Sequence, residues 1–151
     1  RDKVILCDVS GSMATHLNGE AIRAIDVVQS TIDQFKGARI FEFSSRLYAK
    51  KSGKLSKPNG GTNLGGAFYD LKDLKIKKII LLTDGAPDSE AHALNAAKGL
   101  TIDIIYIGPK PTPQFLIDLA NISNGHFTSV ELITGESSKI LENKIKGFLS
   151  A

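Results

Sequence analysis

Two apolar runs that each lead to an aspartate constrain the fold of this chain most. The first run is VILC at residues 4–7 and leads into Asp8, and the second is IILL at residues 79–82 and leads through Thr83 into Asp84. Runs this uniformly apolar are typical of parallel strands that are covered on both faces of a sheet. In such sheets ligands bind beyond the carboxyl ends of the strands, which is where both aspartates fall.

The residues after the first run offer oxygen atoms at a regular spacing. Asp8, Ser10 and Ser12 supply one carboxylate and two hydroxyl groups, each two positions from the next. A tight turn would direct all three at one point, and we expect Gly11 to supply the backbone freedom that this turn needs. Because Mg²⁺ and Ca²⁺ prefer oxygen ligands, this arrangement suits a hard cation.

A glycine loop at residues 60–63 (GGTN) adds a third hydroxyl group, that of Thr62. With the later Thr-Asp-Gly at residues 83–85, the chain reads D-x-S-x-S, then T, then D. In this order and on these elements, the pattern resembles a von Willebrand factor A domain with its metal-ion-dependent adhesion site, and the resemblance covers nearly the whole chain. The residues that match the five metal-binding positions are Asp8, Ser10, Ser12, Thr62 and Asp84.

The resemblance implies a role for each of these residues. Ser10 and Ser12 would bind Mg²⁺ (or Mn²⁺ or Ca²⁺) directly. Asp8 would act mainly through water, whereas Thr62 and Asp84 would exchange direct and water-mediated contacts as a partner arrives. The implied ligand is a Glu or Asp side chain of a partner protein. We therefore expect a metal-dependent protein-binding module that is a monomer and has no catalytic activity of its own.

Strands alternate with helices along the chain, which predicts a doubly wound α/β fold with a mostly parallel sheet and helices on both faces. The expected strands are 3–8, 38–43, 46–49, 78–83, 101–107 and 126–130, and the expected helices are 18–35, 64–74, 90–98, 114–123 and 135–149. The short turn after residue 43 makes the third strand antiparallel to the second. The resemblance implies the strand order 3-2-1-4-5-6. We expect one domain over residues 1–151, trimmed or excised from a longer protein.

Apolar residues recur at three- and four-residue steps in the expected helices, which assigns a buried face to each. The residues expected to point inward are Ala21, Ile25, Val28, Ile32, Phe35, Ala67, Phe68, Leu71, Phe115, Leu116, Leu119, Ile122, Ile140, Leu141, Ile145 and Phe148.

Several residues are assigned supporting roles around the candidate site. Those expected to support its loops or outer shell are Gly11, Gly61 and Asp88. Those expected to form a rim for the partner are Met13, Lys54 and Lys57. For Asp88 the alternative is a helix cap, and for Met13 it is simple packing. The histidines show no zinc-ligand spacing and are expected at the surface, whereas Cys7 is expected in the core.

Composition excludes several classes of protein. A formal net charge of +3 over 151 residues is too mild to indicate nucleic-acid binding. No apolar run approaches the ~20 residues of a membrane span, and no signal-peptide pattern is present. Because the single cysteine cannot form an internal disulfide, a cytoplasmic location is favoured.

Three other interpretations stay open. In a metal-free domain the same residues would only cap a helix and form turns. A phosphatase of the haloacid dehalogenase type would use Asp8 as its nucleophile and Mg²⁺ as cofactor, although Ser10 stands where that family carries a general-acid aspartate. A scaffold would instead bind partners through the lysines clustered at residues 50–57 and 72–78.

Overall fold

The computed structural model describes residues 3–14, 23–35, 37–49, 55–85, 87–108, 111–130 and 137–150. In these ranges, no helix is both long and apolar enough to cross a membrane. In chain order the elements are β1 (Lys3–Asp8), the 3-10 helix η1 (Gly11–Ala14), α1 (Ala24–Ile32), β2 (Ile40–Phe43), β3 (Leu47–Ala49), α2 (Leu64–Asp73), β4 (Lys78–Thr83), α3 (Glu90–Ala96), β5 (Thr101–Ile107), α4 (Gln114–Ile122), β6 (Phe127–Val130) and α5 (Ser137–Leu149).

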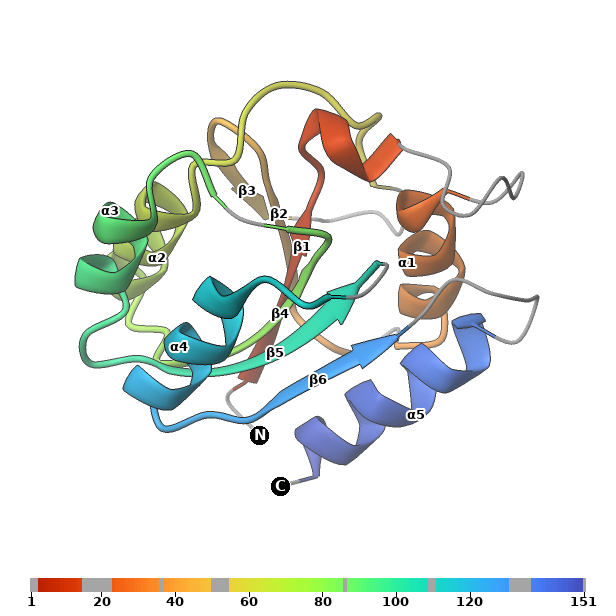
Figure 1. Cartoon of the computed structure of the whole chain (residues 1–151). Coiled ribbons are helices and arrows are strands. Elements are labelled where there is room, and N and C mark those ends of the chain that lie inside the picture. Colours follow the sequence, from red (N-terminus) through yellow and green to blue (C-terminus); the bar gives the residue numbers. More distant parts are fainter. Residues whose placement is uncertain are drawn as a thin grey trace.

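The strands form one six-stranded sheet in the order β3-β2-β1-β4-β5-β6 (Figure 1). All neighbouring strands are parallel except β2 and β3, which are antiparallel. The expected fold class and strand order are therefore confirmed. Ile5 of β1 lies opposite Ile40 of β2 and Ile80 of β4, so these strands end together at what we call the carboxyl end of the sheet.

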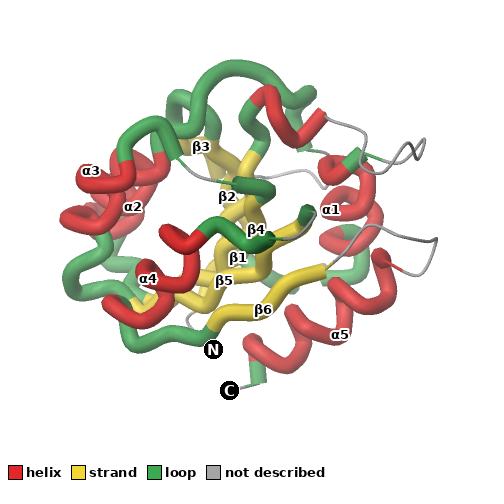
Figure 2. Tube along the Cα trace, in the orientation of Figure 1, coloured by secondary structure: helices red, strands yellow, loops and turns green. Residues whose placement is uncertain are grey.

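Helices cover both faces of the sheet (Figure 2), with α2, α3 and α4 on one face and α1 and α5 on the other. Alternate residues of β1 belong to different cores. Val4 and Leu6 pack on the side of α2 and α4, whereas Ile5 and Cys7 pack on the side of α1 and α5. Burial on both faces explains why the sequence of β1 is apolar without interruption.

Every expected strand and helix occurs, with shifts at the ends of several of them. α1 is described from Ala24 to Ile32, whereas the expected helix ran over 18–35, and residues 18–22 lie outside the described residues. The helices α2, α3 and α4 each end one or two residues earlier than expected, and β2 begins at Ile40 rather than at residue 38. The 3-10 helix η1 was not expected, because the loop after Asp8 was interpreted as a simple turn.

Two residues expected to point inward are exposed instead, Ile122 by 54% and Ile140 by 43%. Ile122 is the last residue of α4, and the next residue, Ser123, takes the inward position and accepts the backbone N–H of Ile102 at 3.2 Å. In α5 the fully buried residues are Leu141 and Ile145. Successive helical residues are rotated by about 100°, and this rotation places Ile140 outside the face that Leu141 and Ile145 bury.

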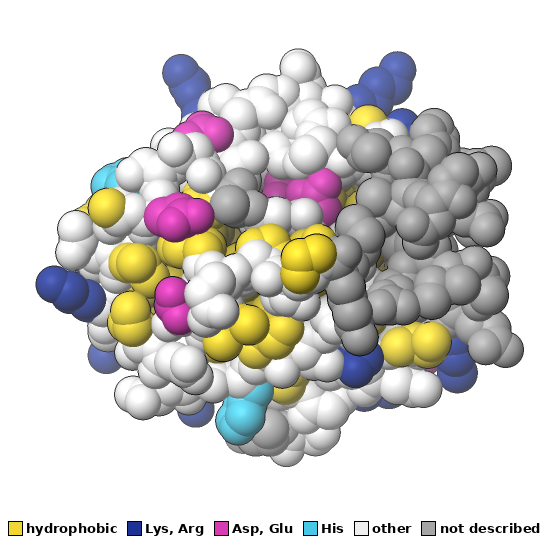
Figure 3. All heavy atoms as spheres, viewed as in Figure 1, with side chains coloured by type: hydrophobic (Ala, Val, Ile, Leu, Met, Phe, Trp, Pro, Cys, Tyr) yellow, Lys and Arg dark blue, Asp and Glu magenta, His cyan; other side chains and the backbone are white. Residues whose placement is uncertain are grey.

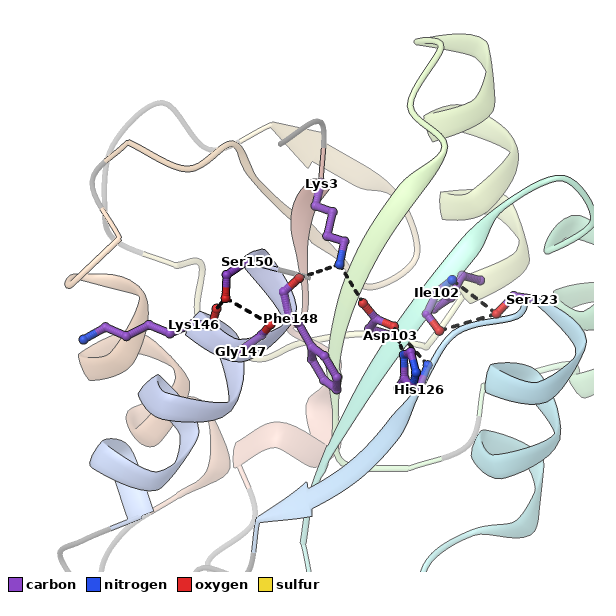
Figure 4. Close-up of polar contacts among 9 residues, drawn as sticks. All are labelled: Lys3, Ile102, Asp103, Ser123, His126, Lys146, Gly147, Phe148 and Ser150. Atoms are coloured by element: carbon purple, nitrogen blue, oxygen red, sulfur yellow. Dashed lines mark hydrogen bonds and ion pairs between the residues drawn. The ribbon is translucent and has the colours of Figure 1, made fainter.

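The amino end of the sheet is closed by a buried ion pair (Figure 4). Lys3 Nζ lies 3.1 Å from Asp103 Oδ2, and the two side chains are 8% and 4% exposed. Lys3 also donates to the carbonyl of Phe148 in the last turn of α5, and Asp103 Oδ1 accepts the backbone N–H of His126. Because the last carbonyls of a helix have no partner within it, Lys3 both neutralises Asp103 and ties α5 to the sheet.

Replacing Asp103 with alanine is expected to destabilise the protein by about 3–5 kcal/mol, because Lys3 would keep a buried charge without its partner. Urea unfolding followed by circular dichroism measures the loss. The matched control is Asp118→Ala, which removes an exposed carboxylate from α4 and is expected to cost about 0.5 kcal/mol or less. Equal unfolding free energies for the two variants would contradict a structural role for the ion pair.

Candidate functional site

Asp8, the last residue of β1, is almost fully buried and held by two hydrogen bonds. Its Oδ1 accepts the backbone N–H of Ser10 at 2.8 Å, and its Oδ2 accepts the hydroxyl of Thr83 at 2.7 Å. Thr83 is the last residue of β4, so the two central strands are joined through their final side chains. A carboxylate offers about four acceptor positions, which leaves Asp8 capacity for further donors or a cation.

A short chain of hydroxyl groups leads from Asp8 to Asp84. Ser10 Oγ lies 3.2 Å from Ser12 Oγ, and the hydroxyl of Ser12 donates to Asp84 Oδ1 at 2.9 Å. Ser10 is buried, whereas Ser12 is exposed to solvent. The loop after β1 and the loop after β4 therefore meet at the carboxyl end of the sheet, as the sequence pattern predicted.

The loop that carries Thr62 is held from the other side by Asp88. The backbone N–H of Thr62 donates to Asp88 Oδ1 at 3.1 Å, and the carbonyl of Thr62 accepts the backbone N–H of Asp88 at 2.9 Å. Gly61 is so close to this carboxylate that a Cβ there would lie 2.7 Å from Asp88 Oδ2. Asp88 therefore supports the Thr62 loop, while the N-cap of α3 is Ser89.

Backbone hydrogen bonds also join the glycine loop to the loop after β1. Gly11 N–H donates to the carbonyl of Gly60 at 3.1 Å, and Asn59 N–H donates to the carbonyl of Val9 at 3.0 Å. Gly60 has a φ of +80°, a conformation that favours glycine. Gly11 has no positive φ, and a Cβ there would meet Gly60 O only at 3.7 Å. The expected need for backbone freedom at Gly11 is therefore wrong, and it applies to Gly60.

Burial makes the two aspartates of this site difficult to ionise together. Burial, and then the charge of Asp8, raises the pKa of Asp84 from 3.8 to about 6. Burial also raises the pKa of Asp8, although the hydrogen bonds from Ser10 and Thr83 act in the opposite direction. On β5, burial and the charge of Asp84 raise the pKa of Tyr106. A cation bound here would relieve the repulsion between the carboxylates.

The structure links four of the expected ligands directly, and these are Asp8, Ser10, Ser12 and Asp84. Thr62 is joined to them only through backbone hydrogen bonds of its loop. Met13 is fully buried, because η1 turns its side chain into the core, so its expected place at the partner rim is wrong. Lys57 is exposed, and Lys54 lies outside the described residues.

The donor set of the site fits a hard divalent cation. Among the residues that the structure describes, no three His, Cys, Asp or Glu side chains gather as a metal-binding group. The joined side chains are instead two carboxylates and two hydroxyls, all of them oxygen donors. Oxygen donors suit Mg²⁺, Ca²⁺ and Mn²⁺ and not the softer metals that prefer thiolates.

Two residues near the site were missed in the sequence. Thr83 donates a hydrogen bond to the Asp8 carboxylate. Its position at the end of an apolar strand, directly before Asp84, was the sequence feature that could have indicated this role. Tyr106 lies on the neighbouring strand β5, close enough for the charge of Asp84 to affect its pKa. Nothing in the local sequence of β5 indicates that proximity, because it arises from strand order.

In the presence of a chelator, Asp84→Asn is expected to raise the melting temperature at pH 7.5. Because the pKa of Asp84 in the folded state is about 6 rather than 3.8, folding takes up a proton between these values. That contribution to stability is complete below pH of about 4 and is lost as the pH rises through about 6. Asparagine keeps an acceptor for the Ser12 hydroxyl but carries no charge, so the variant should regain the lost unfolding free energy. Each kcal/mol regained should raise the melting temperature by about 2–4 °C.

The matched control for this variant is Asp73→Asn, which removes an exposed carboxylate at the end of α2. The wild-type protein and this control should lose stability in parallel between pH 4 and pH 7, while Asp84→Asn should show a flatter profile. Parallel profiles for all three proteins would mean that Asp84 carries no unfavourable charge.

No protein-family profile matches the sequence, and neither does any curated protein. Solved structures do match. The VWA domain of SpRpn10 aligns with a TM-score of 0.67 and 13% identity over 92% of each chain. Manganese-loaded Plasmodium vivax TRAP aligns with a TM-score of 0.65 and 19% identity over 97% of this chain and 72% of that one. BatB from Bacteroides thetaiotaomicron aligns with a TM-score of 0.59 and 14% identity over 99% of this chain and 98% of that one. These likenesses show that the chain has the fold of von Willebrand factor A domains.

Proposed function

We propose that this domain binds a divalent cation, Mg²⁺ or Mn²⁺, and through it an acidic side chain of a partner protein. The residues that would hold the cation are Asp8, Ser10, Ser12, Thr62 and Asp84. The observation that carries the proposal is the hydrogen-bonded chain from Ser10 through Ser12 to Asp84, beside the buried carboxylate of Asp8. Every side chain in it offers an oxygen atom to the same small region.

Charge supports the proposal. Asp8 and Asp84 both have raised pKa values because burial penalises their charges. Within the described ranges, neither forms an ion pair with a lysine, arginine or histidine. Two carboxylates would balance one divalent cation, and the neutral hydroxyls would leave it attractive to an anionic oxygen. Among proteins of the same fold, TRAP is known in a manganese-loaded form.

The surroundings of the site favour a protein ligand. Gly11, Ser12, Asn59 and Gly60 are exposed, so solvent reaches this part of the two loops. In the view of Figure 3, acidic side chains lie on the visible face, and lysine and arginine side chains project from its periphery. The exposed Lys57 precedes the glycine loop, and its charge would steer an acidic partner toward the site. We propose a binding role alone, without catalysis.

The proposal predicts that the wild-type protein binds Mn²⁺ saturably and that Ser12→Ala binds it at least about tenfold more weakly. Ser12 is exposed, so the variant loses an oxygen ligand without opening the core. Calorimetric titration gives the affinity. Thermal melts with and without Mg²⁺ give a second reading, because a cation that binds only the folded state raises the melting temperature.

The matched control is Ser30→Ala, which removes an exposed hydroxyl from α1 and should leave Mn²⁺ affinity unchanged. Asp8→Ala provides a second variant and should abolish binding. The proposal would be overturned by a wild-type protein that shows no saturable Mn²⁺ binding, or by equal affinities for the wild type and Ser12→Ala.

Binding of the partner carboxylate is tested with a short peptide that contains one central glutamate. With Mg²⁺ present, it should shift the backbone amide resonances of Gly11, Ser12 and Gly61. The same peptide with glutamine, and the glutamate peptide with chelator, should leave them in place. Identical shifts with both peptides would show that the protein does not recognise the carboxylate through a cation.

A further inference from the structure

Glu42 is a buried carboxylate outside the candidate cation site. It lies in β2, opposite Cys7 of β1, and is only 2% exposed. Both of its oxygens bind one residue, Ser56. Glu42 Oε2 accepts the backbone N–H at 2.9 Å, and Oε1 accepts the hydroxyl at 2.6 Å. Because a buried charge needs strong hydrogen bonds to be tolerated, this pairing explains how a carboxylate can stand in the core.

The residue before Ser56 is anchored as well. Leu55 is 7% exposed in the core on the α1 side of the sheet, and its backbone N–H donates to the side-chain oxygen of Gln29. Leu55 and Ser56 begin the described segment that leads to α2. The start of this segment is therefore held by side chains of β2 and α1, and not by the residues of the candidate cation site.

From this anchor the chain arches over the carboxyl end of the sheet toward Thr62 and α2 (Figure 1). On the way, two backbone hydrogen bonds join it to the loop after β1, at the residues on either side of Ser10. Beyond Thr62 the next anchor is the hydrogen bond from Asn63 N–H to the carbonyl of Ser44 at 2.7 Å. Ser44 directly follows β2, the strand that carries Glu42. Both ends of the segment are thus attached to β2 or its following turn.

We propose that Glu42 is a positioning residue for the cation site. By fixing Ser56, it would set where the glycine loop crosses the first loop and hence where Thr62 presents its hydroxyl. The inference rests on the proposed function, because it concerns the same site. Glu42 is not itself one of the proposed cation ligands, and it would act through Ser56 and the segment that follows.

A carboxylate suits this position because Ser56 presents its backbone N–H and its hydroxyl to it. Glutamine has nearly the same shape but offers one acceptor oxygen and one NH₂ group. In Glu42→Gln, the amide oxygen could still accept the backbone N–H of Ser56, but the hydroxyl would have to accept from the neutral NH₂ group instead of donating to a charged oxygen. The anchor would therefore be weaker, because hydrogen bonds to a charged group are the stronger ones. The variant is a test of the anchor that leaves the volume of the core unchanged.

Glu42→Gln is expected to weaken Mn²⁺ binding about tenfold, the loss typical when a group that orients metal ligands is removed. The affinity is measured well below the melting temperature. In the metal-free protein, amide hydrogen exchange at Asn59 and Thr62 should become faster relative to the core strands. A residue that only stabilised the fold would lower the melting temperature without changing either the affinity or this local exchange.

A double-mutant cycle with Thr62→Ala identifies the route of the effect. If Glu42 acts through Thr62, Glu42→Gln should weaken binding by less than about threefold once the Thr62 hydroxyl is absent, because coupled sites are not additive. A full tenfold loss in both backgrounds would overturn the assigned route. Asp73→Asn is the matched control for removal of one negative charge, and it should leave affinity unchanged.

Ser56→Ala keeps the inference testable if Glu42→Gln fails to fold. It removes only the hydroxyl donor and keeps the backbone N–H, so binding should weaken by a smaller factor of about threefold. Unchanged affinity in a folded Glu42→Gln, or in Ser56→Ala when the first does not fold, would overturn the positioning role. The proposed function fails separately, because its failure is a wild-type protein that does not bind Mn²⁺.

Discussion

The candidate site depends on two aspartates at the ends of adjacent central strands, of which Asp8 is buried and Asp84 is partly buried. Asp8 ends β1 and Asp84 directly follows β4, in a sheet that helices cover on both faces. The core needs these strands to be apolar along their length, so their polar residues can stand only where they end. Hydrogen bonds from Ser10, Ser12 and Thr83 hold the two carboxylates there without cancelling their charges. The position of the site therefore depends both on the coverage of the sheet by helices on two faces and on the local sequence of the loops.

The loops around the aspartates are held in place mainly by their backbones. Asp88 binds both backbone groups of Thr62, and the glycine loop and the loop after β1 exchange two backbone hydrogen bonds. Backbone contacts restrict position without occupying the hydroxyl groups. The described hydrogen bonds that hold the Thr62 loop therefore do not use the Thr62 hydroxyl. Gly61 contributes to this arrangement, because the absence of a Cβ lets the Asp88 carboxylate approach the backbone of the loop closely.

The fold and most of the candidate site could be predicted because their signals are local. An apolar strand followed by Asp8, or a helix face such as that of Phe115, Leu116 and Leu119, appears within a few consecutive residues. Other positions were not predicted, because they depend on an unexpected local turn or on a segment that is distant in the sequence. Ile122 was misplaced because Ser123 binds strand β5, and Met13 because η1 turns inward. The pairing of Glu42 with Ser56 had no local signal, because β2 and the later segment meet only in the folded chain.

The two ends of the sheet handle buried charge in different ways. At the amino end, Asp103 has Lys3 as a counter-charge at 3.1 Å, and the pair also closes the last turn of α5. At the carboxyl end, Asp8 and Asp84 have hydroxyl and amide donors, and in the described part of the chain no cationic side chain pairs with them. Asp103 thus lies beside a counter-charge, whereas in the described part of the chain Asp8 and Asp84 are held by neutral donors. A buried charge without a counter-charge lowers the stability of a protein, and such destabilising features are typically kept at functional sites. A site that keeps its charge for an incoming cation meets that condition, and this contrast within one molecule favours a binding role over a purely structural one.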